Sequence, residues 1–104
     1  MSEFQTIYPT EVMERVSKGE KLNIVDVREH EEVAQGMIPG AKHIPLQELT
    51  SRYAEINRGE ETIFVCRSGN RSGMACQFLA NLGYQSVKNL AGGMNYWQGD
   101  VVRK

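Results

Sequence analysis

Short apolar blocks alternate with mixed polar segments along the whole chain. Five blocks predict strands, at 6–8, 22–27, 41–44, 63–65 and 86–90. The segments between them predict helices, which follow Pro9, cover 29–35 and 46–56, and continue from Gly73 to Leu82. Strands that alternate with helices at this spacing favour a parallel sheet with helices on both of its faces.

Three of these helices have candidate buried stripes, formed by Val12, Met13 and Val16, by Leu46, Leu49, Tyr53 and Ile56, and by Met74, Ala75, Phe78, Leu79 and Leu82. Cys76 falls about 130° from the centre of the last stripe at 100° per residue, so we expect it to be half-buried. Gly92 and Gly93 predict a close approach of two backbone segments, and Trp97 is expected to pack under the edge of the sheet.

The 104 residues predict a single domain, residues 1–104, with one core. A content of 40% hydrophobic and 24% charged residues is ordinary for a globular protein, and the net charge of −1 gives no field that would attract nucleic acid or an anionic membrane. The chain has no apolar run of transmembrane length and no signal-peptide pattern, so we expect a cytoplasmic protein with reduced thiols. Its two cysteines and two histidines lack metal-ligand spacing, so no metal is expected.

The candidate chemistry lies in the polar segment that follows the apolar run 63–65. It begins with Cys66 and continues through Arg67, Ser68, Gly69, Asn70, Arg71 and Ser72 into a helix. A tight loop before a helix points several backbone N–H groups inward, and the helix N-terminus adds partial positive charge. With Arg67 and Arg71 beside it, the Cys66 thiol should ionise below its ordinary pKa of about 8.5. The alternative is a cysteine that only fills the core, which leaves the polar residues after it unexplained.

Asp26 and Arg28 end the second predicted strand, where open α/β sheets place their sites. They could support the Cys66 loop by accepting its N–H groups or by fixing an arginine. They could equally form an ion pair that stabilises their own loop and does nothing more. The residues favour the second interpretation slightly, and the two are compatible.

Three segments together resemble the rhodanese (thiosulfate sulfurtransferase) family over most of the chain. The segment 66–72 is similar to the family's active-site loop, 25–29 with 36–41 to its N-terminal signature, and 90–94 with Trp97 to its C-terminal signature. Met37 stands where the family commonly has histidine, at a position we expect to be structural. The resemblance implies a three-layer α/β/α sandwich with a five-stranded parallel sheet.

The resemblance also implies that Cys66 carries a sulfane sulfur as a persulfide, with residues 67–72 holding the substrate. The sulfur would come from thiosulfate or a related persulfide donor and pass to cyanide or a thiol. No metal or organic cofactor is needed, and a sulfur-relay protein is a possible partner.

Two other functions remain open from the sequence. A phosphatase or arsenate reductase commonly has Cys-x5-Arg, whereas the spacing from Cys66 to Arg71 is Cys-x4-Arg, a tighter ring that suits a single sulfur atom. A non-catalytic module that carries or senses sulfur for a partner would show the same motifs, although an inactive member would most simply lack the cysteine. Cys76 could act as a resolving thiol, but it lies more than a helical turn from the loop and is expected to be beyond the roughly 7 Å limit for a disulfide.

Overall fold

The computed structural model describes residues 3–103, and its centre is a five-stranded parallel sheet. The strands are β1 (Gln5–Ile7), β2 (Asn23–Asp26), β3 (Lys42–His43), β4 (Thr62–Val65) and β5 (Val87–Leu90), in the spatial order β1-β5-β4-β2-β3. Four parallel pairings join neighbouring strands. The predicted parallel sheet is confirmed, with each strand within about a residue or two of its predicted bounds.

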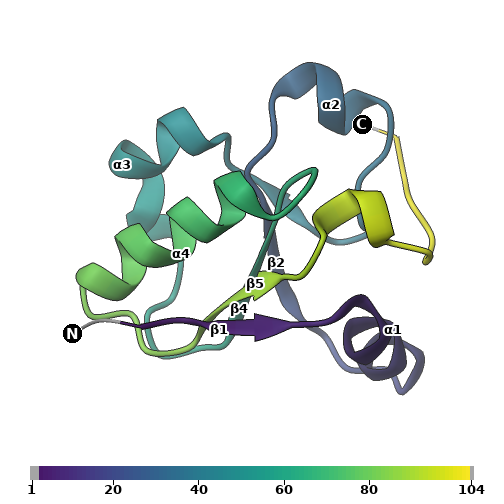
Figure 1. The fold of residues 1–104 in the computed structure, drawn as a ribbon, viewed down its shortest axis with the longest axis horizontal. Coiled ribbons are helices and arrows are strands. Elements are labelled where there is room, and N and C mark those ends of the chain that lie inside the picture. The colour runs from purple at the N-terminus through teal and green to yellow at the C-terminus, as the bar shows by residue number, and fades with distance from the viewer. Residues whose placement is uncertain (1–2, 104) are drawn as a thin grey trace.

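Helical segments connect the strands. They are α1 (Pro9–Ser17), α2 (His30–Ala34), η1 (Leu46–Glu48), α3 (Leu49–Arg52), η2 (Tyr53–Glu55), α4 (Asn70–Asn81) and η3 (Gly93–Tyr96). The carboxyl ends of the strands point toward α2, η3 and the loop that precedes α4 (Figure 1). No helix in the described part of the chain is both long and apolar enough to cross a bilayer.

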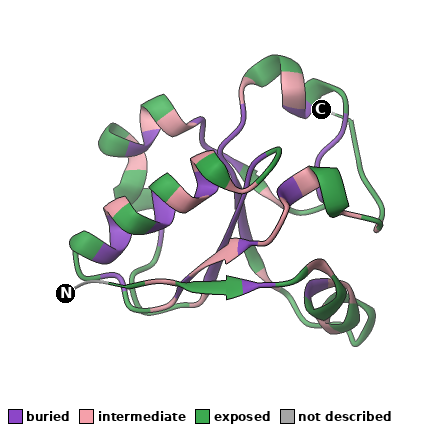
Figure 2. Cartoon of the chain, viewed as in Figure 1, coloured by how far each residue is buried: buried purple, intermediate pink, exposed green. Residues whose placement is uncertain are grey.

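The core lies on both faces of the sheet because successive residues of the central strands point to opposite sides. In β4, Ile63 and Val65 belong to one buried cluster, while Phe64 packs in the other with residues of α3 and α4. Val12 of α1 belongs to the first cluster, and the half-buried Trp97 packs against it as expected. Figure 2 shows the central strands as mostly buried between these layers. This confirms the three-layer α/β/α sandwich.

The helix after the Cys66 loop differs from its prediction in two ways. It begins at Asn70 instead of Gly73, because Gly69 adopts a φ of 108° and turns the chain directly into the helix. Its buried face consists of Ser72, Ala75, Cys76, Leu79 and Ala80, so Cys76 is fully buried. Met74 and Leu82, which were expected in the stripe, are exposed.

A smaller error concerns α1, where Val16 is exposed and only Val12 of the predicted stripe is fully buried. In the segment 46–56 the single predicted helical face is divided among three short turns. Leu49 and Ile56 are buried there as expected, while Tyr53 is partly exposed and packs edge-to-face on Phe78.

Candidate active site

The Cys66 loop connects the most deeply buried strand to α4. Every residue of β4 is buried, and the chain turns away from the sheet immediately after Cys66. Since α4 begins at Asn70, Arg71 and Ser72 lie in its first turn, and the loop itself is only 67–69. The predicted site residues 66–72 are therefore brought together by a tight connection between a strand and a helix. Ser68 and Asn70 have exposed side chains.

The sulfur of Cys66 accepts hydrogen bonds from the loop that follows it. The N–H of Gly69 donates to Sγ at 3.0 Å, and the hydroxyl of Ser72 lies 3.3 Å from the same atom. Cys66 has no exposed surface, with a relative accessibility of 0%. The thiol thus lies among hydrogen-bond donors of the segment that follows it. The sequence predicted that the backbone N–H groups of this loop point inward.

The environment of Cys66 has opposing effects on its pKa. Burial by itself raises the pKa of the thiol, since it disfavours the charged form. Hydrogen bonds from the Ser72 hydroxyl and from the backbone N–H groups of Ser72, Gly69 and Ser68 lower it by more, so the pKa of Cys66 lies below its ordinary value. Among residues 3–103 no hydrogen bond to the Cys76 thiol is found, and burial raises its pKa to about 12. Cys66 is therefore the better nucleophile of the two.

Asn89 of β5 is a site residue that the sequence analysis missed. Its Oδ1 lies 2.5 Å from the Ser72 hydroxyl, and its Nδ2 donates to the carbonyl of Gly69 at 3.1 Å. A hydroxyl has one proton, so Ser72 donates it either to Asn89 or to Cys66 but not to both. Asn89 consequently influences how strongly Ser72 can stabilise a thiolate. No signal in the sequence distinguishes Asn89, because β5 also contains the polar Lys88.

Gly93, which follows Gly92 at the start of η3, lies against the backbone of Cys66 and Arg67. The N–H of Met94 donates to the carbonyl of Cys66 at 2.8 Å, and the N–H of Asn95 donates to that of Arg67 at 3.0 Å. A Cβ on Gly93, which has a φ of +56°, would lie 2.3 Å from the Cys66 carbonyl oxygen. The close backbone approach predicted for Gly92 and Gly93 is confirmed at Gly93.

Both arginines of the loop are paired with one carboxylate, Glu32 of α2. Arg71 binds it through two nitrogens, at 2.7 and 2.9 Å, and Arg67 contacts it at 3.2 Å. The hydrogen bonds from Arg71 are the main reason that the pKa of Glu32 is lowered to about 2, in spite of an opposing effect of burial. Glu32 also accepts the N–H of Glu29 and so closes the first turn of α2. The sequence analysis considered that Asp26 and Arg28 could fix an arginine of the loop and did not predict Glu32 as the partner.

Asp26 and Arg28 form a buried ion pair. Arg28 Nη2 lies 2.9 Å from Asp26 Oδ2 and also donates to the carbonyl of Gly36 at 2.7 Å. The carbonyl of Arg28 in turn lies 2.7 Å from Nε2 of His43. These contacts fit the interpretation in which the pair stabilises its own loop. No direct hydrogen bond from either side chain to the loop 67–69 is present among the described residues.

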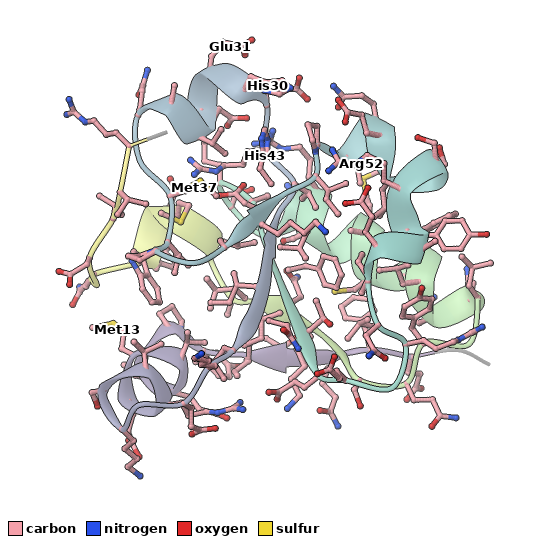
Figure 3. All side chains as sticks on the ribbon, turned by 180° about the vertical axis from the view of Figure 1, so that it is seen from behind. Met13, His30, Glu31, Met37, His43 and Arg52 are labelled. Carbon is pink, nitrogen blue, oxygen red and sulfur yellow. The ribbon has the colours of Figure 1, made fainter. Side chains whose placement is uncertain are left out.

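His43 and Met37 are buried, whereas His30, at the start of α2, is exposed. His30 and His43 meet edge-to-face with ring centroids 4.8 Å apart, and Figure 3 shows them on the inner side of α2. Met37 is buried and exchanges both backbone hydrogen bonds with Val102, each 2.8 Å long. Among residues 3–103 no group of three His, Cys, Asp or Glu side chains is arranged to hold a metal ion.

A cavity of about 580 Å³ borders the loop on its Arg67 side. We call it the Arg67 pocket; its lining residues are Arg28, Glu31, Glu32, Gln35, Gly36, Arg67, Met94, Asn95 and Val101. It lies where α2, η3 and the C-terminal segment come together around the carboxyl ends of the strands (Figure 1). The pocket is large enough for a small molecule and is lined by Arg67, whereas Cys66 is not among its lining residues.

Comparison with known proteins agrees with this geometry. Residues 8–100 match the family model described as Rhodanese-like domain. A Bacillus subtilis protein named "Putative sulfurtransferase YtwF" is 38% identical over 102 residues, which cover 98% of each chain. The protein named "Thiosulfate sulfurtransferase GlpE" of Pseudomonas putida GB-1 is 33% identical over 98 residues, 94% of this chain and 88% of that one.

Solved structures agree as well. The crystal structure of a rhodanese-like domain protein from Staphylococcus aureus superimposes with a TM-score of 0.88 at 32% identity, and the match covers 97% of this chain and 99% of that one. The family match covers every helix and strand except β1, and it also leaves out the last residues of the tail. On these grounds the chain belongs to the rhodanese-like domain family.

Proposed function

We propose that this protein is a sulfurtransferase that moves a sulfane sulfur from thiosulfate or a related persulfide donor to a thiol or cyanide. The observation that carries the proposal is the ring of hydrogen-bond donors around Cys66 Sγ, which lowers the pKa of the thiol despite its burial. Relatives of this chain named as sulfurtransferases support the same reaction class.

In the first half-reaction the Cys66 thiolate attacks the outer sulfur of the donor. With thiosulfate, the S–S bond of the donor breaks, sulfite leaves with the electron pair of that bond, and Cys66 becomes a persulfide. The outer sulfur of the persulfide is anionic and can accept hydrogen bonds from the same N–H groups that stabilise the thiolate. In this scheme Arg67 and Arg71, which carry more positive charge than their shared partner Glu32 neutralises, stabilise the charge of the donor and of the departing sulfite.

In the second half-reaction a nucleophilic acceptor attacks the outer sulfur. Cyanide gives thiocyanate and a thiol gives its own persulfide, and in both cases the bond to Cys66 breaks and the thiolate returns. The scheme is ping-pong and needs neither a metal nor an organic cofactor. Among the enzymes that use a cysteine in an anion-binding loop, the tight spacing from Cys66 to Arg71 favours this chemistry over phosphoryl transfer.

Access to Cys66 requires a small rearrangement, because the residue has no exposed surface. Of the two arginines, Arg67 is the one that can move at lower cost. It is 64% exposed and its contact with Glu32 is a single one of 3.2 Å, whereas Arg71 is held through two nitrogens. An anionic donor can therefore draw Arg67 away from Glu32 while Arg71 stays in place.

The test is the intact mass of the protein after incubation with thiosulfate and then with cyanide. We expect a gain of one sulfur that maps to Cys66, disappears on addition of cyanide and yields thiocyanate. Cys66→Ser should abolish the gain, while Cys76→Ser, the matched control for a buried thiol, should retain it. A gain of mass that persists in Cys66→Ser would exclude this function. So would the absence of any gain when the unaltered protein is treated with thiosulfate or a persulfide donor.

A further inference from the structure

Asn89 of β5 lies on the side of the sheet that faces α4. Its partner in the β4–β5 register is Phe64, and both Phe64 and Val87, two residues before Asn89, pack in the core cluster shared with α4. Side chains two residues apart on a strand point to the same face of the sheet. Ser72 is on the buried side of α4 and has no exposed surface. The fold therefore brings the Asn89 amide, the Ser72 hydroxyl and the Cys66 sulfur together.

The carbonyl of Gly69 fixes the orientation of the Asn89 amide. A carbonyl can only accept a hydrogen bond, so the amide nitrogen Nδ2 is the atom that donates to it, at 3.1 Å. Glycine at position 73 leaves room for this contact, since a Cβ there would lie 3.4 Å from Nδ2. The amide oxygen Oδ1 then faces Ser72, and towards that hydroxyl it can act only as an acceptor.

The Ser72 hydroxyl has one proton and two acceptors within reach. Its oxygen lies 2.5 Å from Asn89 Oδ1 and 3.3 Å from Cys66 Sγ. The amide oxygen is closer, and it is a stronger acceptor than an uncharged sulfur, so the hydroxyl donates to Asn89 while Cys66 is a thiol. A charged acceptor binds a donor more strongly than a neutral one, so the hydroxyl turns to the sulfur when Cys66 is a thiolate.

We propose that Asn89 is a positioning residue that determines when Ser72 stabilises Cys66. Asn89 holds the hydroxyl proton away from Sγ while that sulfur is uncharged, either as a thiol or as the inner atom of a persulfide. When an acceptor attacks the outer sulfur of the persulfide, the bond to Sγ breaks and its electron pair stays on Sγ. The Ser72 hydroxyl then rotates toward the new charge, and no proton is transferred. The part that concerns the persulfide rests on the proposed sulfurtransferase function.

This competition predicts that loss of Asn89 makes Cys66 more acidic, although Asn89 also supports the loop. Leucine is similar in size to asparagine and has no polar side-chain atom, so in Asn89→Leu the thiolate gains the Ser72 hydroxyl without the loss of another bond. The pKa of Cys66 should then fall by about half a unit to one unit, which corresponds to one neutral hydrogen bond. The Gly69 carbonyl still accepts the N–H of Gly73 at 3.0 Å, so the loop keeps its backbone support.

Asn89→Leu changes no charge near the sulfur. The charged and titratable side chains of the elements around the Cys66 loop are Asp26, Arg28, Glu32, His43, Arg67 and Arg71. Of these, Arg71 has a pKa that responds to a charge on Cys66, and Glu32 binds it through two nitrogens. Asparagine and leucine are both uncharged, so a shift in this variant reports the lost acceptor.

The first test is the rate of alkylation of Cys66 by iodoacetamide as a function of pH, which needs no sulfur donor. Every protein carries Cys76→Ser, and urea unfolding shows that each variant is folded. We expect a lower midpoint in Asn89→Leu and an unchanged one in Asn81→Leu, which alters an exposed asparagine at the end of α4. Asn89→Ala is the second variant and should shift the midpoint in the same direction. An unchanged or raised midpoint in the Asn89 variants would overturn the proposal.

A double-mutant cycle distinguishes this role from a merely structural one. Ser72→Ala leaves no proton to share, so Asn89→Leu should not lower the midpoint in that background. If Asn89→Leu acted by loosening the loop, it would shift the midpoint equally in both backgrounds. That result would overturn the proposal.

The second test follows discharge by cyanide of the persulfide that thiosulfate forms. A more stable thiolate leaves faster, so Asn89→Leu should increase the discharge rate roughly twofold, and the increase should disappear in the Ser72→Ala background. A lowered midpoint with an unchanged discharge rate would overturn the role in the departure of the thiolate. Failure of the unaltered protein to form a persulfide would count against the proposed function, and the alkylation cycle would still decide the role of Asn89.

Discussion

Replacing Ser72 by alanine should raise the pKa of Cys66 and slow every reaction that needs its thiolate. Burial opposes ionisation of this thiol, and the side chain of Ser72 is the strongest of the groups that counteract it. Ser72 is itself fully buried, so alanine, which differs only by the hydroxyl oxygen, leaves the packing of α4 on the sheet nearly unchanged.

The size of the effect follows from how the hydroxyl is shared. A hydrogen bond to a charged group contributes about 1.5–3 kcal/mol, and one between neutral groups about 1 kcal/mol. When Cys66 ionises, Ser72 must turn its one proton from Asn89 Oδ1, 2.5 Å away, to the sulfur at 3.3 Å. The net stabilisation of the thiolate is the difference, roughly 0.5–2 kcal/mol, so the pKa of Cys66 should rise by about one unit in Ser72→Ala.

The assay is the rate of alkylation by iodoacetamide as a function of pH, in a Cys76→Ser background that leaves a single thiol. The midpoint of the rate profile gives the pKa of Cys66. Ser68→Ala is the matched control, because Ser68 offers the sulfur its backbone N–H and its side chain is exposed. A midpoint that does not move in Ser72→Ala, or moves equally in Ser68→Ala, would refute the role given to the hydroxyl.

Two further predictions concern the supports of the loop. Glu32→Gln keeps a capping side chain on α2 but loses the negative charge. Because folding lowers the pKa of this carboxyl from 4.5 to about 2, it is ionised in both the folded and the unfolded state above about pH 5. Glu32→Gln should therefore destabilise the protein most in that pH range. The difference in unfolding free energy, measured with urea, should shrink as the pH falls toward 2; a constant difference would contradict the ion-pair argument. Gly93→Ala should cost more stability than Gly19→Ala, which has a φ of +86° but no atom near the added Cβ and so loses only about 1–2 kcal/mol. Only Gly93→Ala should also slow the alkylation of Cys66. If the two changes had equal effects on stability and on the alkylation rate, the clash with the Cys66 carbonyl would be contradicted.

The sheet could be predicted from the sequence because its central strands leave few alternatives. The apolar runs that became β2 and β4 are short, rich in β-branched residues and bounded by polar segments, as strands buried on both faces must be. The helices were less certain. On α4 two overlapping stripes satisfy the same period, and the structure uses the one with Ser72, Ala75 and Cys76, because small residues let the helix pack closely on the sheet.

The reactive half of the site could also be predicted, since Cys66 and the loop after it are continuous in sequence. Its partners could not. Glu32 is 39 residues from Arg71, and Asn89 is 17 residues from Ser72, so neither contact leaves a local pattern. Both depend on which strand ends lie next to each other, and therefore on the completed sheet. The start of α4 was missed for a local reason, because Gly69 acts through its backbone conformation.

These partners change which groups should be credited with activating the thiol. The sequence analysis credited the backbone N–H groups of the loop together with the two arginines, but Glu32 neutralises one unit of the arginines' charge and holds Arg71 by two bonds. The largest influences that lower the pKa of Cys66 are instead hydrogen bonds from Ser72 and the loop backbone. Arg71 still senses a charge on Cys66, which contributes to raising its own pKa, so the two groups are coupled. In the proposed mechanism the loop backbone and Ser72 would therefore stabilise the Cys66 thiolate, and Arg67, with its single contact to Glu32, would be the arginine that meets the anionic part of a substrate.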